Sequence, residues 1–492
     1  MRDLDGIKKY KEENSQTKFD LEDIGEAEES KAVETKPARL IDTFKLNKIS
    51  HVKARYARKA SRVKIKRSPR TRSAKTIILI ILFFVAIASI AIFTSQEYAL
   101  LRLASTLKNE NILIGLQNSA ELRPTGGFWG SFLIWEIKNN FRDSQILFET
   151  NPYKKNNPLM EEAVVEAPKP IKETWLDMPL SFVNANWSYD FPEAAKTISW
   201  YFGQGWDRPN NGVVAISSLA MIDLLRLTGP VEAGDGTQIS ADNFTQVLSQ
   251  KIDTEYWQNP QNIEVNEPKT ILKDIAPQII SKAKKISKLK MYKYTKEQMK
   301  KGRVICYFPD PKKEKFCEKL GISGKVEPYS VDYLSVNNTN LNGGKSSLNI
   351  SQSVSYEVSR ADNQNIGALE IKRTCEKNKW PNIVNRNYTR VITPLGSKIL
   401  SATLADKDIT NDIEVNEEFG RTTFGFWFSV APGETIGAKI KYLLPYNISS
   451  DDSYNLVVQK QPGTLPDNIG IKFFDRTIFK GENDINVLRT EI

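Results

Sequence analysis

A single apolar run near the N-terminus most constrains how this 492-residue chain can fold. No charged residue occurs in the 21 residues from Thr76 to Gln96, and Ser89 is the one polar residue between Ile77 and Phe93. At about 1.5 Å rise per residue, a helix of this length spans roughly 30 Å, the thickness of a bilayer core. We expect residues 76–96 to form a transmembrane helix, because a buried helix of a soluble protein would keep a polar stripe.

Basic residues crowd the N-terminal side of this run. Residues 37–75 contain 14 Lys and Arg but one acid, Asp42. The positive-inside rule then places the N-terminus in the cytoplasm and residues 97–492 outside it. About 75 residues precede the run and no small-x-small cleavage site follows it. We therefore expect an uncleaved signal anchor that crosses the cytoplasmic membrane once.

The formal net charge of +10 is unevenly distributed along the chain. Residues 1–36 hold 7 basic and 11 acidic residues, so an acidic segment precedes the basic one and the part beyond residue 75 is almost neutral. Clustered cations can bind nucleic acid, but beside a membrane span they are better explained as a topology signal that contacts anionic lipid. We expect a bilayer partner, no nucleic acid, and a disordered cytoplasmic tail over residues 1–75.

The part beyond the membrane divides into two regions that differ in their secondary-structure patterns. Residues 97–320 mix strand and helix patterns and predict an extracytoplasmic α/β domain. Residues 325–480 carry short β-rich runs separated by Asn342-Gly343, Pro432-Gly433 and Pro462-Gly463, which is typical of an all-β sandwich. The predicted fold class is therefore mixed α+β, consisting of a transmembrane helix, an α/β domain and a β-sandwich.

Individual elements of the α/β domain can be predicted from the spacing of apolar residues and from capping and turn residues. A long loop is expected around Pro158, Pro168 and Pro170, and Ser217 or Ser218 is expected to cap a helix. The other predicted elements are helices at 97–108, from Phe191, at 219–227, after Ser240 and from Pro268 to Leu289, and strands at 111–117, 128–137 and 212–216. The lysines of the last helix are expected to form a solvated face.

Histidine and cysteine content limits the chemistry. His51 is the only histidine, so residues 52–492 cannot form Ser-His-Asp triads, Cys-His dyads or His-ligated zinc sites. Cys306 and Cys317 could form a disulfide in an oxidising compartment, which would leave Cys375 unpaired; three free thiols are the alternative.

The loop Glu121–Gly127 is the strongest polar feature. Gly126 and Gly127 allow backbone N–H groups to converge on an anion, and the Arg123 guanidinium can donate two hydrogen bonds to phosphate or carboxylate. The alternative is a Gly-rich hairpin in which Arg123 pairs with Glu121 or with another acid. Gly343-Gly-Lys-Ser346 does not have the spacing of a P-loop, because Thr339 occupies the position of the required first glycine, and it is better explained as a turn.

Several strings together resemble a bacterial family called domain of unknown function 4012, in order over residues 98–465. They are Gln117-Asn-Ser-Ala-Glu-Leu-Arg-Pro-Thr-Gly-Gly-Phe128, Asn184-Ala-Asn-Trp-Ser-Tyr-Asp-Phe-Pro192, Gly212-Val-Val-Ala-Ile216, Leu227-Thr-Gly-Pro-Val231, Ile239-Ser-Ala-Asp-Asn243 and Asn342-Gly-Gly-Lys-Ser346. The resemblance implies a membrane-anchored, extracytoplasmic protein and no established activity.

The order of elements is also similar, more distantly, to LytR-CpsA-Psr proteins. That similarity implies transfer of a glycopolymer from a polyprenyl-pyrophosphate carrier, aided by Mg²⁺. Arg123 would match the first pyrophosphate-binding arginine, whereas Thr125 stands where that family has Asp, and no second Arg-Asp pair occurs before Asn184. The candidate ligand-binding residues are Arg123, Thr125, Gly126, Gly127, Asn184, Asn186 and Asp190, with Asp190 as the candidate Mg²⁺ ligand.

Two functions therefore remain open. The first is a non-catalytic envelope protein that binds or scaffolds cell-wall glycan or another protein, through aromatics such as Trp187 or Trp427 if these are not core residues. The second is a LytR-CpsA-Psr-like phosphotransferase, or a binder of polyprenyl-pyrophosphate-linked glycopolymer, working without histidine. The two predict different surroundings for Arg123, Asn184, Asn186 and Asp190, which should converge on an apolar cleft only in the second.

Overall fold

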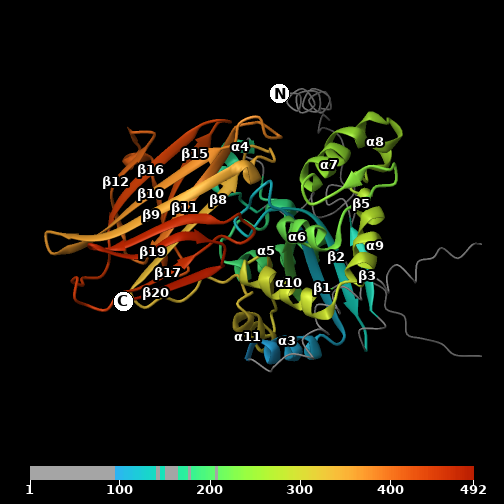
Figure 1. Cartoon of the computed structure of the whole chain (residues 1–492), viewed down its shortest axis with the longest axis horizontal. Helices are drawn as coiled ribbons and strands as arrows, with labels where there is room; N and C mark the ends of the chain where they lie inside the picture. Colours follow the sequence, from blue (N-terminus) through green and yellow to red (C-terminus); the bar gives the residue numbers. More distant parts are fainter. Residues whose placement is uncertain (1–94, 140–143, 150–164, 176–178, 206–208) are drawn as a thin grey trace, which may run out of the picture. The chain divides into compact units, whose positions relative to one another are not determined.

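The computed structural model describes residues 95–139, 144–149, 165–175, 179–205 and 209–492 (Figure 1). Of the two compact units in the chain, 1–66 and 67–492, only the second contains described residues. The predicted cytoplasmic tail and nearly all of the predicted span at 76–96 lie outside them. Within the described ranges, no helix is both long and apolar enough to cross a membrane.

A five-stranded sheet with the order β3-β2-β1-β4-β7 organises the α/β region. Its strands are β1 (Glu110–Asn118), β2 (Phe128–Ile137), β3 (Gln145–Glu149), β4 (Gly212–Ser217) and β7 (Val304–Tyr307). β1 lies in the middle and pairs antiparallel with β2 and parallel with β4. The three strands predicted from the sequence are therefore confirmed, and β7 adds an antiparallel edge.

Alternation along the strands gives this sheet two apolar faces. Leu113, Phe132 and Val213 point to one face, where a cluster of buried side chains covers them. That cluster contains side chains from α4 (Lys169–Trp175), η3 (Phe182–Asn184) and α5 (Phe191–Gly205). Ile112 and Leu133 point to the opposite face and belong to a separate cluster.

Helices accompany this second face (Figure 1). They are α3 (Ser95–Thr106), α6 (Ser218–Thr228), α7 (Phe244–Gln250), α9 (Ile271–Ala283), α10 (Lys288–Lys300) and α11 (Pro311–Leu320). The predicted cap of α6 is confirmed, because the Ser217 side chain accepts a hydrogen bond from the Leu219 N–H. Smaller elements complete the region: β5 (Val231–Glu232), β6 (Gln238–Ile239), η4 (Lys251–Glu255), η5 (Tyr256–Gln258) and α8 (Gln261–Val265).

Two expectations about local structure are wrong. The stretch around Pro168 and Pro170 is not simply a loop, since α4 begins at Lys169 and β3 precedes it as the partner of β2. Pro158, the third proline of that prediction, lies outside the described residues. The helix expected from Pro268 to Leu289 is two helices, α9 and α10. Ser287 separates them because its side chain caps α10 by accepting a hydrogen bond from the Lys290 N–H, and serine is a favoured cap.

Two further sheets form the β region after residue 325. The seven-stranded sheet contains β13 (Lys407–Asp408), β12 (Lys398–Leu404), β16 (Thr435–Leu443), β10 (Gln364–Cys375), β9 (Ile350–Ala361), β18 (Asp467–Phe473) and β19 (Arg476–Asn483), in that order. The six-stranded sheet contains β14 (Glu414–Glu418), β15 (Arg421–Val430), β11 (Asn385–Pro394), β8 (Asp332–Asn340), β17 (Asn455–Gln459) and β20 (Val487–Glu491).

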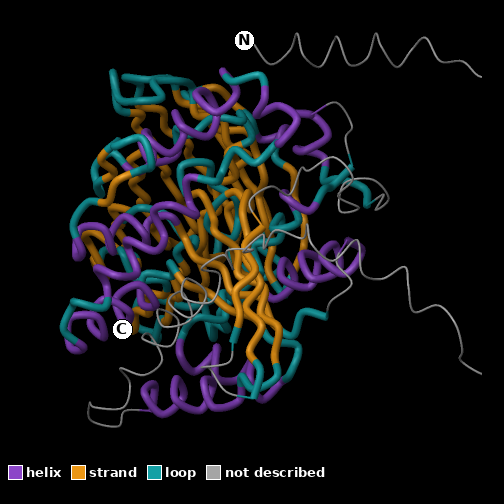
Figure 2. The backbone as a smooth tube through the Cα atoms, turned by 90° about the vertical axis from the view of Figure 1, so that its right-hand side faces the viewer, coloured by secondary structure: helices purple, strands orange, loops and turns teal. Residues whose placement is uncertain are grey.

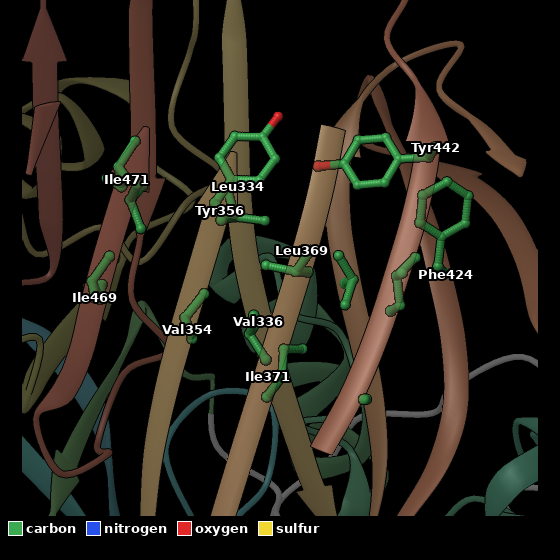
Figure 3. Close-up of a cluster of buried hydrophobic side chains, with 14 of the residues drawn as sticks. Leu334, Val336, Val354, Tyr356, Leu369, Ile371, Phe424, Tyr442, Ile469 and Ile471 are labelled. Atoms are coloured by element: carbon green, nitrogen blue, oxygen red, sulfur yellow. The ribbon is translucent and has the colours of Figure 1, made fainter. Parts of the chain in front are cut away.

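One apolar core joins these two sheets (Figure 3). Leu334 and Phe424 of the six-stranded sheet share it with Val354, Leu369 and Tyr442 of the seven-stranded sheet. The strands continue to Glu491, beyond the end at 480 expected from the sequence. Helices and strands are distinguished by colour in Figure 2, where helices flank the strands.

Candidate functional site

Arg123, the central residue of the predicted anion loop, is buried and hydrogen-bonded within the protein. Its side chain donates to the Asn340 carbonyl at 2.5 Å, to Asn184 Oδ1 at 3.2 Å and to Glu121 Oε1 at 3.0 Å. Only 2% of Arg123 is exposed. The pairing with Glu121 that the sequence allows is therefore present, and no donor face of the guanidinium is directed at solvent.

The next polar residues form a second buried network. Thr125 Oγ1 accepts hydrogen bonds from Gln117 Nε2 at 2.6 Å and from Asn186 Nδ2 at 2.9 Å. Asn186 Nδ2 also donates to the Gly127 carbonyl at 2.9 Å. Asn184 and Asn186 thus contact the Arg123 loop through buried hydrogen bonds that hold its conformation, and neither they nor Arg123 lines the apolar cavity described below.

Asp190 lies apart from these contacts, at the N-terminus of α5. Its carboxylate accepts hydrogen bonds from the Val326 N–H at 2.9 Å and the Glu193 N–H at 3.3 Å. Burial raises the pKa of Asp190, while these N–H groups oppose the rise. In the described part of the chain, no group of three or more His, Cys, Asp or Glu residues is placed to hold a metal ion.

The Arg123 loop also joins the α/β region to the β region. Gln461 Nε2 donates to the Arg123 carbonyl at 2.9 Å, and Asn337 Nδ2 donates to the Pro124 carbonyl at 3.1 Å. The Ser347 N–H, next to the Gly343–Ser346 string, donates to the Ala120 carbonyl at 2.9 Å. Segments far apart in the sequence therefore meet at the Arg123 loop. We call these contacts of the loop with Asn337, Ser347 and Gln461 the clasp.

The two tryptophans considered as surface binders are half-buried in packed contacts. Trp187 stacks on Tyr388 with ring centres 6.2 Å apart. Trp427 lies under the Arg386 guanidinium at 4.0 Å and donates a hydrogen bond to Glu173 at 3.0 Å. Packing between the two regions accounts for both side chains.

A large cavity lies between the second face of the sheet and the helices. Its volume is about 1740 Å³, well above the roughly 300–1,000 Å³ of ordinary small-molecule pockets. The sheet wall includes Ile114, Leu116, Leu133, Trp135, Val214 and Ile216; the helix wall includes Ala220, Leu224, Leu248, Leu272, Ile275 and Ile279. Most of these wall residues belong to two separate apolar clusters, one on the sheet side and one on the helix side.

Strand β4 shows how the cavity leaves apolar side chains uncovered. Val213 and Ala215 pack on the α5 side, with 0% and 1% exposed. Val214 and Ile216 face the cavity and are only half-buried. Because protein interiors contain few voids larger than a water molecule, this lining is suited to an apolar ligand.

Charged and polar groups line another part of the cavity. Lys269, in the turn before α9, donates a hydrogen bond to the Gly130 carbonyl. Lys345, in the loop after β8, pairs with Asp253 of η4 at 2.7 Å. Burial lowers the pKa of Lys269 to about 8. Glu121 of the Arg123 loop also lines this part, so the clasp forms one side of it.

These cations were missed in the sequence, for identifiable reasons. Lys345 lies in the Gly343–Ser346 string, which forms a bend in the loop between β8 and β9, and this loop carries the lysine to the cavity. Lys269 directly follows Pro268, the expected start of a helix. Neither lysine has a local pattern that distinguishes it from a solvated one.

Apolar side chains in and just after α3 line the cavity, and so does Cys306, which belongs to a disulfide. Leu100 and Leu103 extend from α3, which starts where the predicted span ends, and Leu107 directly follows that helix. The disulfide between Cys306 and Cys317, which the sequence allows, joins β7 to α11, and Cys375 is a buried free thiol.

Part of this architecture matches a known family. Residues 108–252, from β1 into η4, match the family model described as Protein of unknown function (DUF4012). This match supports the DUF4012 family. The DUF4012 segment contains the Arg123 loop and most of the sheet wall of the cavity. A comparison with curated proteins gives no match.

Solved structures offer only weak likenesses. A candidate nutrient binding protein of Legionella pneumophila is 7% identical, with 29% of this chain and 54% of that chain covered and a TM-score of 0.20. An M1 zinc metallopeptidase of Deinococcus radiodurans is 11% identical, with 25% of this chain and 32% of that chain covered and a TM-score of 0.16. Aminopeptidase A of Legionella pneumophila is 9% identical, with 31% of this chain and 20% of that chain covered and a TM-score of 0.18. The chain thus spans about half or less of each structure. At these TM-scores none of them supports an assignment of fold or function.

Proposed function

We propose that this protein is a membrane-anchored, extracytoplasmic binding protein for a lipid with a long apolar chain and an anionic head group, of the polyprenyl phosphate or pyrophosphate class. The observation that carries the proposal is the 1740 Å³ cavity, with its long apolar walls and its lysines. Burying apolar surface contributes roughly 25 cal/mol per Å², so a long hydrocarbon chain in this space would bind favourably.

The head group is assigned to the polar part of the cavity. No carboxylate neutralises Lys269 within the described ranges. Its hydrogen bond goes to the Gly130 carbonyl, and it makes no ion pair there. Lys345 is held nearby on the cavity wall by Asp253. Ser217 and Ser218 at the N-terminus of α6 line the same cavity, and a helix N-terminus favours anions.

The position of α3 supports supply of the lipid from a membrane. If residues 76–96 cross the bilayer, Leu100 lies four residues beyond the end of the span, or about 6 Å along a helix. The cavity side chains of α3 would then be next to the bilayer surface. A lipid could reach the cavity without its apolar chain crossing much water.

The proposal is binding and does not extend to group transfer. The LytR-CpsA-Psr resemblance would assign the pyrophosphate to Arg123 and Mg²⁺ to Asp190. The Arg123 guanidinium is engaged by Glu121 and Asn340, and Asp190 is engaged by backbone N–H groups. We therefore place the anion at Lys269 and Lys345 and treat Arg123 as a positioning residue of the clasp.

Native mass spectrometry of the full chain, released from detergent micelles, tests this function. Three ligands would be compared: a polyprenyl phosphate, the uncharged polyprenol of the same length, and geranyl phosphate as a short-chain control. We expect one bound polyprenyl phosphate, weaker binding of polyprenol and no retained geranyl phosphate. Absence of any polyprenyl complex, with a cooperative thermal transition retained, would contradict the proposal.

A further inference from the structure

The helical hairpin of α9 and α10 presents an unusually basic surface. Residues 281–300 contain eight lysines and a single acid, Glu297. Lys284, Lys285, Lys288, Lys290 and Lys293 are all exposed, and we call these five the basic patch. No ion pair involves a patch lysine within the described ranges, although Lys301, Lys273 and Lys251 elsewhere in the region are paired.

A large apolar side chain projects from the middle of this patch. Leu289 is 61% exposed, close to Ile263 at 60% and Val265 at 55%. The buried residues of α10 are Met291, Tyr294 and Gln298, which fixes its inward face. Leu289 and Lys293 lie four residues apart on the outward face, so leucine and lysine point the same way.

A side-chain contact places the patch beside the first turn of α3. The Tyr292 hydroxyl donates a hydrogen bond to Glu97, which is buried with 6% exposed. Tyr98, the next residue of α3, is 52% exposed. Three features of a membrane interface therefore occur together: clustered lysines, an exposed leucine and an exposed tyrosine.

We propose that the basic patch, with Leu289 and Tyr98, is a docking surface for the anionic head groups of the bilayer from which the chain emerges. The inference rests on the membrane anchor of the proposed function, because α3 starts at Ser95, within the last residues of the predicted span. Each lysine near an anionic surface favours association, and several together fix an orientation. Docking here holds the α3 side of the cavity at the bilayer.

Lysine acylation of the full chain in nanodiscs tests this surface. The chain is assembled in discs of phosphatidylcholine alone or with phosphatidylglycerol, acylated briefly, and analysed by peptide mass spectrometry. We expect the patch lysines to react about fivefold more slowly in the anionic discs, and the difference to disappear near 1 M salt. Lys398, Lys407, Lys439 and Lys472, exposed on the β region, should react equally in both discs.

A pair of matched variants separates docking from a general effect of lipid charge. Leu289→Glu should restore acylation of Lys288 and Lys290 in anionic discs, whereas Ile263→Glu, at a residue 60% exposed on α8, should not. Equal acylation of the patch in both discs, with the chain retained in them, would overturn the docking surface alone. A chain that separates from the discs would overturn the anchor and the docking surface together.

Discussion

The ammonium group of Lys345, in the loop after β8, lies 2.7 Å from the carboxylate of Asp253 in η4. This ion pair joins the β region to the α/β region at the wall of the cavity. Asp253 is 45% exposed and Lys345 21% exposed at the side chain, so the pair is accessible to a competing anion. A phosphate head group would take the place of the carboxylate.

Removing the competing acid should therefore strengthen lipid binding. Asp253→Asn leaves Lys345 free for phosphate, and we expect the affinity for polyprenyl phosphate to rise about fivefold, as expected for roughly 1 kcal/mol from a partly exposed pair. Titration by native mass spectrometry measures the change. Asp242→Asn, an exposed acid at the start of α7, is the matched control. An unchanged or lower affinity in Asp253→Asn would remove Lys345 from the head-group site.

Binding should also depend on pH through Lys269. Burial lowers the pKa of this lysine to about 8, opposed by Asp253 and Glu121 and assisted by Lys345. A bound phosphate favours the charged form, so affinity should be highest below pH 8 and fall as the pH rises above it. Lys269→Met should weaken binding and abolish this dependence. Lys398→Met, at an exposed lysine of the β region that does not line the cavity, should do neither.

The lowered pKa of Lys269 also makes the free energy of unfolding depend on pH. The folded pKa of about 8 lies below the unfolded value, so the unfolded chain binds more protons between them and the free energy of unfolding rises with pH in that window. At pH 7 the buried charge opposes folding. Lys269→Met should consequently raise the thermal midpoint of the ligand-free protein at pH 7. A lower midpoint would show that the Lys269 contact with Gly130 dominates.

Substitution of Arg123 should lower the free energy of unfolding. Arg123→Ala leaves Glu121 without its partner in a buried setting, and breaking such a pair costs about 3–5 kcal/mol. Urea unfolding measures the loss. Arg226→Ala is the control, because its pair with Asp223 is exposed and should cost at most about 1 kcal/mol. Full stability with abolished lipid binding in Arg123→Ala would instead assign this arginine to the ligand.

The clasp between the two regions can be tested at a Pro-Gly turn. A Cβ added to Gly463, whose φ is +65°, would lie 2.4 Å from the Gly126 carbonyl oxygen, so backbone must move. We expect Gly463→Ala to cost about 3 kcal/mol or more, from overpacking added to left-handed strain. Gly433→Ala, in the other Pro-Gly turn, meets only the flexible Lys377 side chain and should cost about 1 kcal/mol. Similar losses in both would argue against a tight clasp.

Periodicity and capping residues predicted most of the elements that build the sheet. The apolar runs of β1, β2 and β4 predict these strands, and Ser217 caps α6, as expected of a serine before an apolar helix. The sequence predicts one helix where α9 and α10 lie, because lysines continue through the break between them. Only the cap at Ser287 marks the boundary, and a serine within a basic run is a weak signal.

The cavity could not be predicted from the sequence. Ile216 has the same place in the strand period whether a helix or an empty space covers it, so the pattern indicates an apolar face and not what fills it. Arg123 shows the same limit for a charged residue. Its partner Glu121 is two residues away and was recognised as an alternative, but Asn340 is 217 residues away and only the fold brings it into contact.

Filling the cavity is the most direct test of lipid binding. Ile216 is half-buried and faces the space from β4, so Ile216→Trp should occupy the path of the apolar chain without displacing packed neighbours. Ile216→Val is the control that keeps the space open. Native mass spectrometry should show one polyprenyl phosphate on the wild type and on Ile216→Val, and none on a folded Ile216→Trp. Equal occupancy in all three proteins would contradict a lipid chain held between the sheet and its helices.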